Sequence, residues 1–400
     1  MSRGSSRRIL IAGAGVAGLA AGLAFARRGF EVQIFEQADA LEEIGAGLQL
    51  SPNATRILNA LGVLDSLLPA AVRPQAVVLR RASDLAELAR VPLGEAASRR
   101  WGSPYIVCHR ADLQSALLNA VLETSAISLA TGARVKDFGL EPARLAVEAG
   151  AASKEHEGAL VVAADGVWSA IRAHAGDRGR SRFIGQLAWR RTLDVGDADW
   201  AMFAESREVV SAYLSPGFHL IAYPMRGGTA MNLAAFTTYR RELPRGWAEK
   251  VDVAVLQAAI RRAAPDLARL ADSGERWTAF PIHVADLDGA WSDPSGLALI
   301  GDAAHAMTPF AAQGAAMAIE DAETLAQAVS ARPEDLGAAL RDWTVARRRR
   351  VLRVARRGAL NQFAWHARGP AAAARDAFLR WRGPEKLAAD LDWLYGWKAG

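Results

Sequence analysis

The first group of residues with a chemical signature is a glycine motif between an apolar stretch and a helical pattern. RILIA is followed by Gly13-Ala14-Gly15-Val16-Ala17-Gly18, and the next apolar stretch, FEVQIF, is followed by Glu36 and Gln37. Glycines at this spacing permit a tight turn, close approach of the backbone to a pyrophosphate, and close packing of helix on strand. The helix N-terminus attracts phosphates, and Glu36 can bind ribose hydroxyls. The motif predicts a dinucleotide site but does not distinguish NAD from FAD.

A second group lies in the stretch LALIGDAAHAMTPFAAQGAAMA, where Asp302 follows an apolar strand pattern and Gly314 begins an alanine-rich helical pattern. A buried carboxylate is costly without a partner, so we expect Asp302 either to be satisfied by the fold or to meet a ligand. The helix N-terminus at Gly314 would carry about half a positive charge and could stabilise an anion. His305, close to Asp302, is expected to order this loop rather than to react.

A third group lies in the stretch GFHLIAYPMRGG. On a strand, His219 and Tyr223 would share one face about 13 Å apart, with Ile221 between them. This spacing could bracket one aromatic ring, and a base at this position could take the proton of a ring hydroxyl. The alternative is a satisfied histidine and a packed tyrosine on a half-buried sheet. The sequence contains no cluster with metal-ligand spacing and no GxSxG motif of a serine hydrolase.

The elements that must position these residues alternate between strands and helices. We expect helices over 16–28, 55–68, 109–125 and 249–271, strands over 75–94 and 159–166, and an antiparallel sheet over 183–240. The predicted fold class is α/β, with a Rossmann-like dinucleotide-binding domain, an antiparallel β-sheet substrate domain and C-terminal helices. We assign the dinucleotide-binding domain to 1–72, 98–180 and 274–340, the substrate domain to 73–97 and 181–273, and the helical segment to 341–400.

The composition is that of an ordinary globular chain of 400 residues, with 51% hydrophobic residues and a net charge of +5. The basic run 345–357 follows a helical pattern, so we interpret it as a solvated helix face and expect no nucleic-acid partner. The single cysteine, Cys108, excludes an internal disulfide and fits a reducing compartment. The basic residues and the apolar stretch at the N-terminus resemble a signal peptide, but cleavage there would remove the first predicted strand. We therefore expect a cytoplasmic protein with no stable membrane span.

Several motifs, taken in order along the chain, carry a family resemblance. GAGLQLSPNA (45–54), AADGVWSAIR (163–172) and GDAAHAMTPFAAQGA (301–315) together resemble the single-component flavoprotein monooxygenases that hydroxylate aromatic rings, the salicylate hydroxylase and hydroxybenzoate hydroxylase group. The turn His109-Arg110-Ala111-Asp112-Leu113 and the tail DWLYGW (392–397) fit this group, and the chain also resembles 6-hydroxynicotinate 3-monooxygenase. The resemblance implies tightly, non-covalently bound FAD, with NAD(P)H as a transient co-substrate and O2 as oxidant.

The resemblance also implies roles for single residues of the cofactor site. Gly47 would lie beside the flavin, Arg110 would contact the phosphate and ribityl region, and Val135 would border the adenine. The other implied cofactor residues are Asp165 and Gly166 near the pyrophosphate and NAD(P)H, Asp302 at a ribityl hydroxyl, and Gly314 and Ala315 with N–H groups toward the flavin ring.

The resemblance extends to the substrate pocket. The spacing of His219 and Tyr223 matches residues that line the pocket in the salicylate hydroxylase-like branch. The expected pocket also contains Leu48, Ile221, Pro309 and Phe310, with Met307 in its apolar shell. The chain departs from the family at Ala312, where glycine is frequent, and alanine fits there if its φ is negative. An acidic substrate would need an arginine, for which Arg190 and Arg226 are both candidates.

These observations lead to one main hypothesis and several alternatives. The main hypothesis is hydroxylation of a phenolic or hydroxylated heteroaromatic acid through a flavin C4a-hydroperoxide, with or without decarboxylation. A ubiquinone-biosynthesis-type hydroxylase of a prenylated ring shares the motifs, but the DWLYGW tail speaks against it. A flavin halogenase would carry a Trp-x-Trp-x-Ile-Pro pattern, which the sequence lacks. A non-catalytic nucleotide-binding redox regulator is the alternative from another class. The oligomeric state, monomer or homodimer, stays open.

Overall fold

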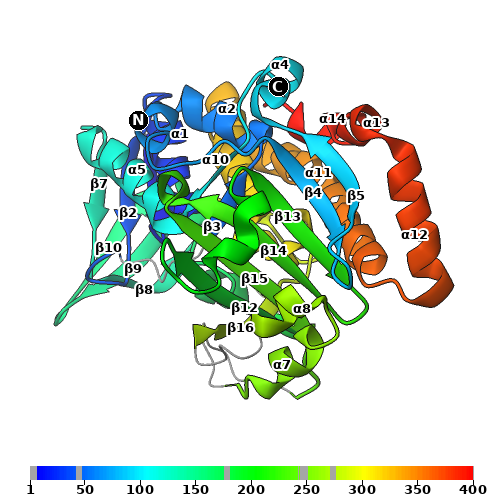
Figure 1. Cartoon of the computed structure of the whole chain (residues 1–400). Helices are drawn as coiled ribbons and strands as arrows, with labels where there is room; N and C mark the ends of the chain where they lie inside the picture. Colours follow the sequence, from blue (N-terminus) through cyan, green and yellow to red (C-terminus); the bar gives the residue numbers. More distant parts are fainter. Residues whose placement is uncertain are drawn as a thin grey trace, which may run out of the picture.

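The computed structural model describes residues 7–41, 47–174, 181–241, 243, 251–270 and 276–399. Its first layer is a six-stranded sheet with the strand order β17-β18-β11-β1-β2-β7. Figure 1 labels β2 and β7 of this sheet on its left side. The strands are β1 (Arg8–Ala12), β2 (Glu31–Phe35), β7 (Ile127–Ala130), β11 (Leu160–Ala163), β17 (Ser292–Asp293) and β18 (Leu297–Leu299). The pairs from β18 to β7 are parallel, whereas β17 pairs with β18 antiparallel.

This sheet is buried between helices, which explains its almost continuous apolar strands. β11 (LVVA) is buried at every residue, as expected for a parallel sheet that is covered on both faces. The helix α1 (Val16–Ala26) follows β1 and is buried on nearly every side. It packs against α5 (Arg110–Glu123) and α10 (Gly314–Ala331). The order β1, α1, β2 confirms the expected strand-helix-strand opening.

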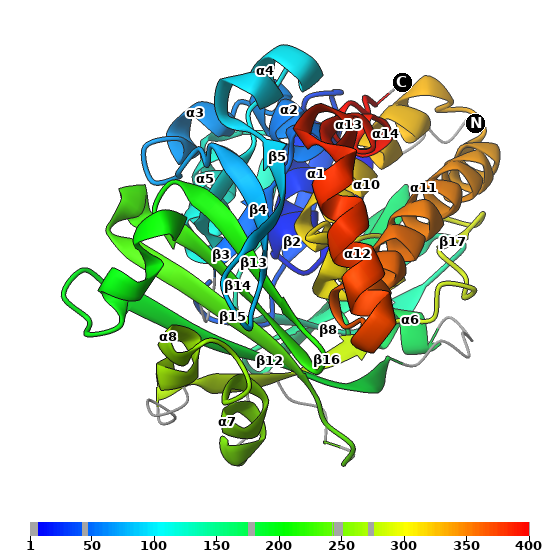
Figure 2. The same cartoon turned by 45° about the vertical axis from the view of Figure 1, so that its right-hand side comes forward.

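The second layer is a seven-stranded sheet with the order β16-β12-β15-β14-β13-β4-β5. Its strands are β4 (Ala76–Arg81), β5 (Glu87–Pro92), β12 (Arg182–Asp194), β13 (Val209–Ser215), β14 (Phe218–Met225), β15 (Ala230–Thr238) and β16 (Thr278–Val284). One face buries Trp189, Phe218 and Leu220 against α7 (Ala254–Ile260) and α8 (Pro265–Ala268), which lie below the sheet in Figure 2. On the other face, Tyr223 belongs to the core of the six-stranded sheet. The two layers therefore meet across this second face.

Smaller elements complete the described chain. A three-stranded sheet contains β8 (Ala133–Gly139), β9 (Ala143–Ala149) and β10 (Ala152–Gly158), and β3 (Gly47–Leu50) pairs with β6 (Ile106–His109). The other α-helices are α2 (Pro52–Ala60), α3 (Leu64–Leu67), α4 (Gly94–Trp101), α6 (Ala170–His174), α9 (Asp302–His305), α11 (Leu336–Trp365), α12 (Gly369–Arg382), α13 (Pro384–Ala389) and α14 (Asp392–Tyr395). Short 3-10 helices cover Trp200–Ser206, Arg226–Gly228 and Pro309–Ala311. None of the described helices combines the length and apolar composition needed to cross a membrane.

Two predicted helices are interrupted. The helix expected over 55–68 is split into α2 and α3 around Gly62, whose φ is +77°. The part of 249–271 that the structure describes, 251–270, contains the two short helices α7 and α8, and α8 begins at Pro265. Glycine with a positive φ and proline without an N–H group both interrupt helices, so the apolar periodicity across them was misleading.

The prediction of a solvated face for the basic run 345–357 is wrong in part. Arg347 lies on α11 with a side chain that is only 2% exposed, and it donates to Glu320 and Asp321 of α10 at 2.7 Å each. The C-terminal tail covers neighbouring arginines, since the guanidinium of Arg353 lies 4.0 Å from the ring centroid of Trp393. The run therefore fastens α11 to α10 and to the C-terminus.

Candidate active site

Four of the predicted site segments meet at one edge of the six-stranded sheet. The glycine motif follows β1, Glu36 follows β2, Asp165 follows β11, and Asp302 follows β18. Because these strands are parallel, their carboxyl ends lie along the same edge, which is where open α/β sheets bind ligands. The order reverses at β1, since β2 and β11 flank it on opposite sides.

The glycine loop has one position that the fold leaves open. Gly13 has a φ of +102°, and a methyl group there would lie 2.5 Å from Ala164 O. A methyl group at Gly18 would lie 1.9 Å from Gly13 O, so both glycines are required by the backbone itself. A methyl group at Gly15 would meet no atom within 4 Å. Gly15 thus faces a space in which a ligand can approach the N-terminus of α1. Val16 and Ala17 continue the loop into that helix.

The acidic residue after β2 also organises this loop. Glu36 accepts hydrogen bonds from Ala14 N through Oε2 at 2.8 Å and from Ala38 N through Oε1 at 3.0 Å. The carboxylate therefore fixes the backbone next to Gly15 in addition to its predicted role at a ribose. Gln37 is exposed, and Val135 is half-buried on β8.

The Asp165 carboxylate lies beside the β1–β11 crevice with one oxygen engaged. Oδ2 accepts from Ala170 N at 2.9 Å, whereas Oδ1 is buried without a hydrogen-bond partner. Burial raises the pKa of Asp165 above its ordinary value, against the opposing effect of its hydrogen bonds. Gly166 has a φ of +81° and open space at its α-carbon. Arg172, which the sequence did not single out, ties this loop to the β18 loop because it donates to Ala303 O at 2.6 Å.

The expectation that the Asp302 carboxylate is buried is wrong. Asp302 is exposed at the start of α9, and its side chain has no hydrogen bond or ion pair within the described chain. A neighbouring carboxylate that is buried is Asp321 on α10, which accepts from Gly301 N at 2.9 Å and lies 2.5 Å from His305 Nε2. Burial alone would raise the pKa of Asp321, but the opposing effects of His305 and Arg347 lower it. His305 thus orders the loop, as expected.

The loop before α10 contains a strained residue. Ala312 has a φ of +51°, so the condition of a negative φ, under which alanine would fit, is not met, and alanine takes a conformation that glycine adopts more easily. The side chain of Gln313 fixes the loop, because it donates to Ser51 Oγ at 2.9 Å and accepts from Asn53 Nδ2 at 3.2 Å. α10 begins at Gly314, where a methyl group would meet no atom within 4 Å.

The start of α10 therefore borders open space at Gly314, which is exposed. Gly314 and Ala315 lie in its first turn, where N–H groups have no partner within the helix. Gly47 lies at the start of β3, and its N–H group donates to Asn232 Oδ1 at 2.9 Å. Arg110 is exposed at the start of α5, after the His109 cap. Apart from Val135 within β8, the predicted cofactor residues are thus found next to strand ends and helix starts.

The face of β14 that was predicted to bracket a ring is turned toward the cofactor segments. His219, Ile221 and Tyr223 share this face, and the His219 ring lies 5.2 Å from the Phe310 ring, centroid to centroid. His219 also stacks on Phe236 of β15, with centroids 4.5 Å apart. Of the other expected pocket residues, Leu48 lies on β3, and Pro309 begins the 3-10 helix that contains Phe310.

A second histidine, which the sequence analysis missed, contacts the first. His366 caps the C-terminus of α11, and its Nε2 lies 3.0 Å from His219 Nδ1. Burial, followed by the neighbouring His366, lowers the pKa of His219 well below its ordinary value, so that His219 is neutral at physiological pH. The pKa of His366 is also lowered, first by burial and then by Arg368.

Tyr223 lies at the other end of this face against Gly47. A methyl group at Gly47 would be 2.7 Å from the Tyr223 hydroxyl, so glycine is required for this approach. Burial raises the pKa of Tyr223, which keeps its phenol protonated. Asn232, opposite Tyr223 on β15, is 1% exposed and leaves Nδ2 without a hydrogen-bond partner. A protonated phenol and a free amide donor therefore lie together at the cofactor end of the sheet.

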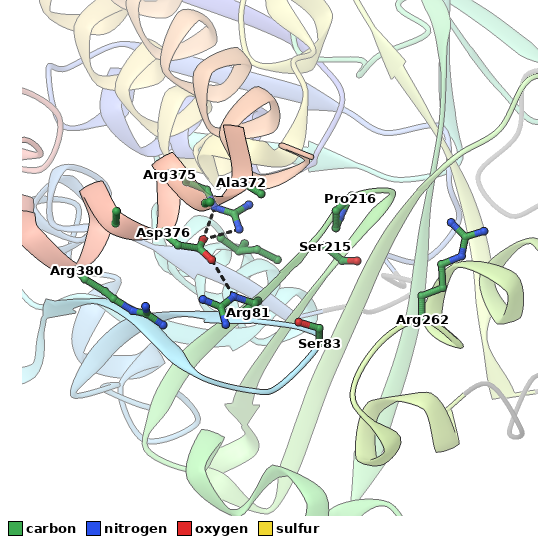
Figure 3. Close-up of a pocket in the computed structure, with 12 residues that line it drawn as sticks. Arg81, Ser83, Ser215, Pro216, Arg262, Ala372, Arg375, Asp376 and Arg380 are labelled. Carbon is green, nitrogen blue, oxygen red and sulfur yellow. Dashed lines mark hydrogen bonds and ion pairs between the residues drawn. The ribbon is translucent and has the colours of Figure 1, made fainter. Parts of the chain in front are cut away.

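A separate hollow of about 640 Å³ lies between α12 and the turns of the seven-stranded sheet (Figure 3). None of the predicted site residues lines it. Its charged centre is Asp376, which accepts from Arg81 at 2.8 Å and from Arg375 at 2.6 Å. These ion pairs join α12 to β4 and account for the buried charge without a ligand.

The residues at the sheet edge fit the FAD that the resemblance implies. A dinucleotide with a ribityl chain needs room at the helix starts and polar groups for its hydroxyls. The room is present at Gly15 and Gly314, and the polar groups are the unpaired Oδ1 of Asp165 and the unpaired carboxylate of Asp302. Within the part of the chain that the structure describes, no group of acidic, histidine or cysteine side chains could hold a metal ion.

Comparison with known proteins identifies the family of the chain. Residues 7–357 match the FAD binding domain family. The 3-hydroxybenzoate 6-hydroxylase of Polaromonas naphthalenivorans is 33% identical over 98% of this chain and 96% of its own length. The 3-amino-4-hydroxybenzoate 2-monooxygenase of Streptomyces cremeus is also 33% identical, with the same coverage. A salicylate hydroxylase substrate complex has the same fold, with a TM-score of 0.81 at 23% identity over 100% of this chain and 97% of the other. The chain therefore belongs to the FAD binding domain family and, within it, to the FAD-dependent monooxygenases.

Proposed function

We propose that the protein hydroxylates a phenolic or hydroxylated heteroaromatic carboxylic acid, with NAD(P)H as reductant and O2 as oxygen donor. The observation that carries this proposal is the β14 face, on which His219, Ile221 and Tyr223 lie between the aromatic ring of Phe310 and the cofactor loop at Gly47. Relatives that act on hydroxybenzoate and aminohydroxybenzoate support the substrate class.

Bound FAD would supply the oxygen-activating chemistry, and the protein would hold it at the sheet edge. The residues that we propose for this role are Gly13, Gly15, Val16, Ala17, Gly18, Glu36, Gln37, Gly47, Arg110, Val135, Asp165, Gly166, Asp302, Gly314 and Ala315. Asn232 joins them because its Nδ2 is a buried donor without a partner next to Gly47. The partial positive charge at the N-terminus of α10 would favour negative charge on the flavin ring.

The two predicted catalytic residues suit different tasks. His219 is neutral, so its free Nε2 can accept the proton of a substrate hydroxyl while Nδ1 passes one to His366. Tyr223 keeps its proton and can orient the substrate by hydrogen bonding. Phe236, Phe310 and the other apolar pocket residues, Leu48, Ile221 and Pro309, would exclude water.

The first experiment uses the purified, FAD-loaded protein. NADH and NADPH oxidation are followed with hydroxybenzoates, aminohydroxybenzoates, hydroxynicotinates and, as controls, phenols without a carboxylate. We expect one group of acids to stimulate oxidation and to give a hydroxylated product in mass spectrometry, which also reveals any decarboxylation. If phenols without a carboxylate, or prenylated phenols, are the better substrates, the proposed substrate class is wrong.

The setting of the reaction is a further part of the proposal. We propose a cytoplasmic enzyme that acts as a monomer or homodimer and has no nucleic-acid partner. All residues that we propose for the site belong to one chain, so we expect activity not to depend on protein concentration. Light scattering together with activity over a dilution series tests this, and loss of activity on dilution would require a site that is shared between subunits.

A further inference from the structure

One arginine of the seven-stranded sheet faces the proposed substrate site. Arg190 of β12 pairs with Ala234 of β15, and Ala234 pairs with Ile221 of β14. Side chains of directly paired residues lie on the same face of a sheet. Arg190 therefore shares the face of Ile221, and with it that of His219 and Tyr223, at a backbone separation of two strands, or about 10 Å from Ile221.

The guanidinium of Arg190 lacks a protein counter-charge. Within the described chain it has no hydrogen bond and no ion pair, and its named contact is the Phe280 ring, whose centroid lies 5.6 Å from Cζ. The side chain is partly buried, and burial lowers the pKa of Arg190, with a smaller opposing effect from Tyr223 and a further lowering by Arg110. An arginine stays charged in proteins, so a cation without a partner in such a place is costly unless a ligand compensates it.

The neighbouring residue, Arg191, is an example of a structural arginine whose charge is neutralised within the protein. Arg191 points to the opposite face of β12, and its side chain is 1% exposed. It lies 3.1 Å from a carboxylate oxygen of Asp197 and 2.8 Å from one of Asp199. Two carboxylates neutralise Arg191, whereas no carboxylate among the described residues pairs with Arg190. The difference between adjacent residues indicates that the free charge of Arg190 serves a ligand on the site face.

The second arginine that the sequence offered for this role is excluded by its position. Arg226 follows β14, its side chain is 54% exposed, and it lies 3.9 Å from a carboxylate oxygen of Asp194. It is a surface residue with an ion-pair partner. This makes Arg226 a matched control for charge removal in the same domain.

We propose that Arg190 binds the carboxylate of the aromatic substrate and thereby sets which ring position faces the flavin. A guanidinium and a carboxylate can form two parallel hydrogen bonds, which fix orientation as well as position. With its acid group at Arg190, the ring would lie over Ile221 and direct its hydroxyl to His219 or Tyr223. This inference rests on the proposed function, and it adds the residue that selects acids over neutral phenols.

The test compares an acid with its neutral analogue in binding, without turnover. FAD-loaded wild type, Arg190→Gln, Arg190→Lys and Arg226→Gln are titrated with salicylate, 3-hydroxybenzoate, 4-hydroxybenzoate, 3-amino-4-hydroxybenzoate and 6-hydroxynicotinate and with the corresponding amides, by flavin fluorescence or calorimetry. We expect the wild type to prefer an acid to its amide. Arg190→Gln should weaken acid binding by roughly 10- to 100-fold and amide binding by less than about threefold. Arg190→Lys should fall between, and Arg226→Gln should match the wild type.

Each other result contradicts a specific part of the account. Unchanged acid binding in Arg190→Gln would refute the inference and leave the proposed function standing. Equal weakening of acid and amide would make Arg190 a residue of general pocket structure. Loss of FAD from Arg190→Gln, with normal FAD content in Arg226→Gln, would assign Arg190 to the cofactor instead. A wild type that binds none of these acids would overturn the inference together with the proposed substrate class.

Discussion

Replacing Gly15 and Gly18 by alanine, one at a time, separates what the dinucleotide loop needs for folding from what it needs for binding. Gly15 has a φ of −71° and a ψ of −176°, a conformation open to any residue, and an added methyl group would meet no atom within 4 Å. An added methyl group at Gly18 would lie 1.9 Å from the carbonyl oxygen of Gly13. Both substitutions add one methyl group, at Gly15 into open space and at Gly18 into contact with the backbone.

The expected magnitudes follow from these contacts. In FAD-free protein, Gly15→Ala should change the free energy of unfolding by less than about 1 kcal/mol, with a slight gain from the stiffer unfolded chain. Gly18→Ala forces the backbone of the loop to move and should cost roughly 1–3 kcal/mol, as overpacking does. For FAD binding, both variants should lose affinity. The methyl group of Gly15→Ala occupies the space through which the pyrophosphate approaches, and Gly18→Ala moves the backbone of the same loop. Loss of one or two charge-assisted hydrogen bonds corresponds to about 10- to 100-fold.

The assay is urea unfolding of the FAD-free proteins, followed by calorimetric titration with FAD. Gly15→Ala is the decisive variant, because it should keep the stability of the wild type while binding FAD much more weakly. Wild-type FAD affinity in Gly15→Ala would refute the placement of the pyrophosphate at this loop. A large loss of stability in Gly15→Ala would show that its open space is filled by the protein.

Three further predictions concern stability and pH. Ala312→Gly should raise the free energy of unfolding by roughly 0.5–1 kcal/mol, because it relieves a left-handed alanine at φ +51°, and a loss of stability in urea would contradict this. Protonation of His219 is opposed in the folded state, so its contribution to stability is present above its ordinary pKa of 6.5 and is lost as the pH falls toward its lower folded pKa. We therefore expect the free energy of unfolding to fall less in His219→Gln than in the wild type when the pH is lowered from 7.5 to 5.5. The difference between the two should reach at most about 1.4 kcal/mol for each pH unit below 6.5, measured by urea unfolding at each pH. Arg347→Met, which removes the buried guanidinium that contacts both Glu320 and Asp321, should cost up to about 3–5 kcal/mol although Arg350 and His305 still contact these carboxylates, whereas the same change at the exposed Arg349 should cost almost nothing.

The cofactor edge of the fold could be predicted because its signals are local. Each of Gly13, Glu36, Asp165 and Asp302 lies within three residues of the end of a short apolar strand, and parallel strands bring such positions to one edge. The relatives confirm the flavoprotein monooxygenase prediction and overturn the alternative of a non-catalytic regulator. The roles of the single residues stay predictions, of which the Gly15→Ala variant tests the one at the dinucleotide loop.

The substrate side was less predictable because it depends on contacts between distant segments. His219 meets His366 across 147 residues, and Arg190 joins the β14 face only through the register of β12 on β15. Sequence spacing also cannot show which carboxylate is buried, since Asp302 and Asp321 both lie next to apolar residues. The helix α10 turns Asp321 inward onto Arg347, and the loop leaves Asp302 exposed.

The most direct measurement of the central claim is isotope incorporation by the FAD-loaded protein under ¹⁸O₂, with NADH or NADPH and the best aromatic acid of the panel. We predict a yellow protein whose product carries one oxygen atom from O2 and forms as the nicotinamide is oxidised. A colourless protein that takes up no FAD would contradict the account. So would nicotinamide oxidation that yields only hydrogen peroxide with every acid tested, or a hydroxyl oxygen that comes from water.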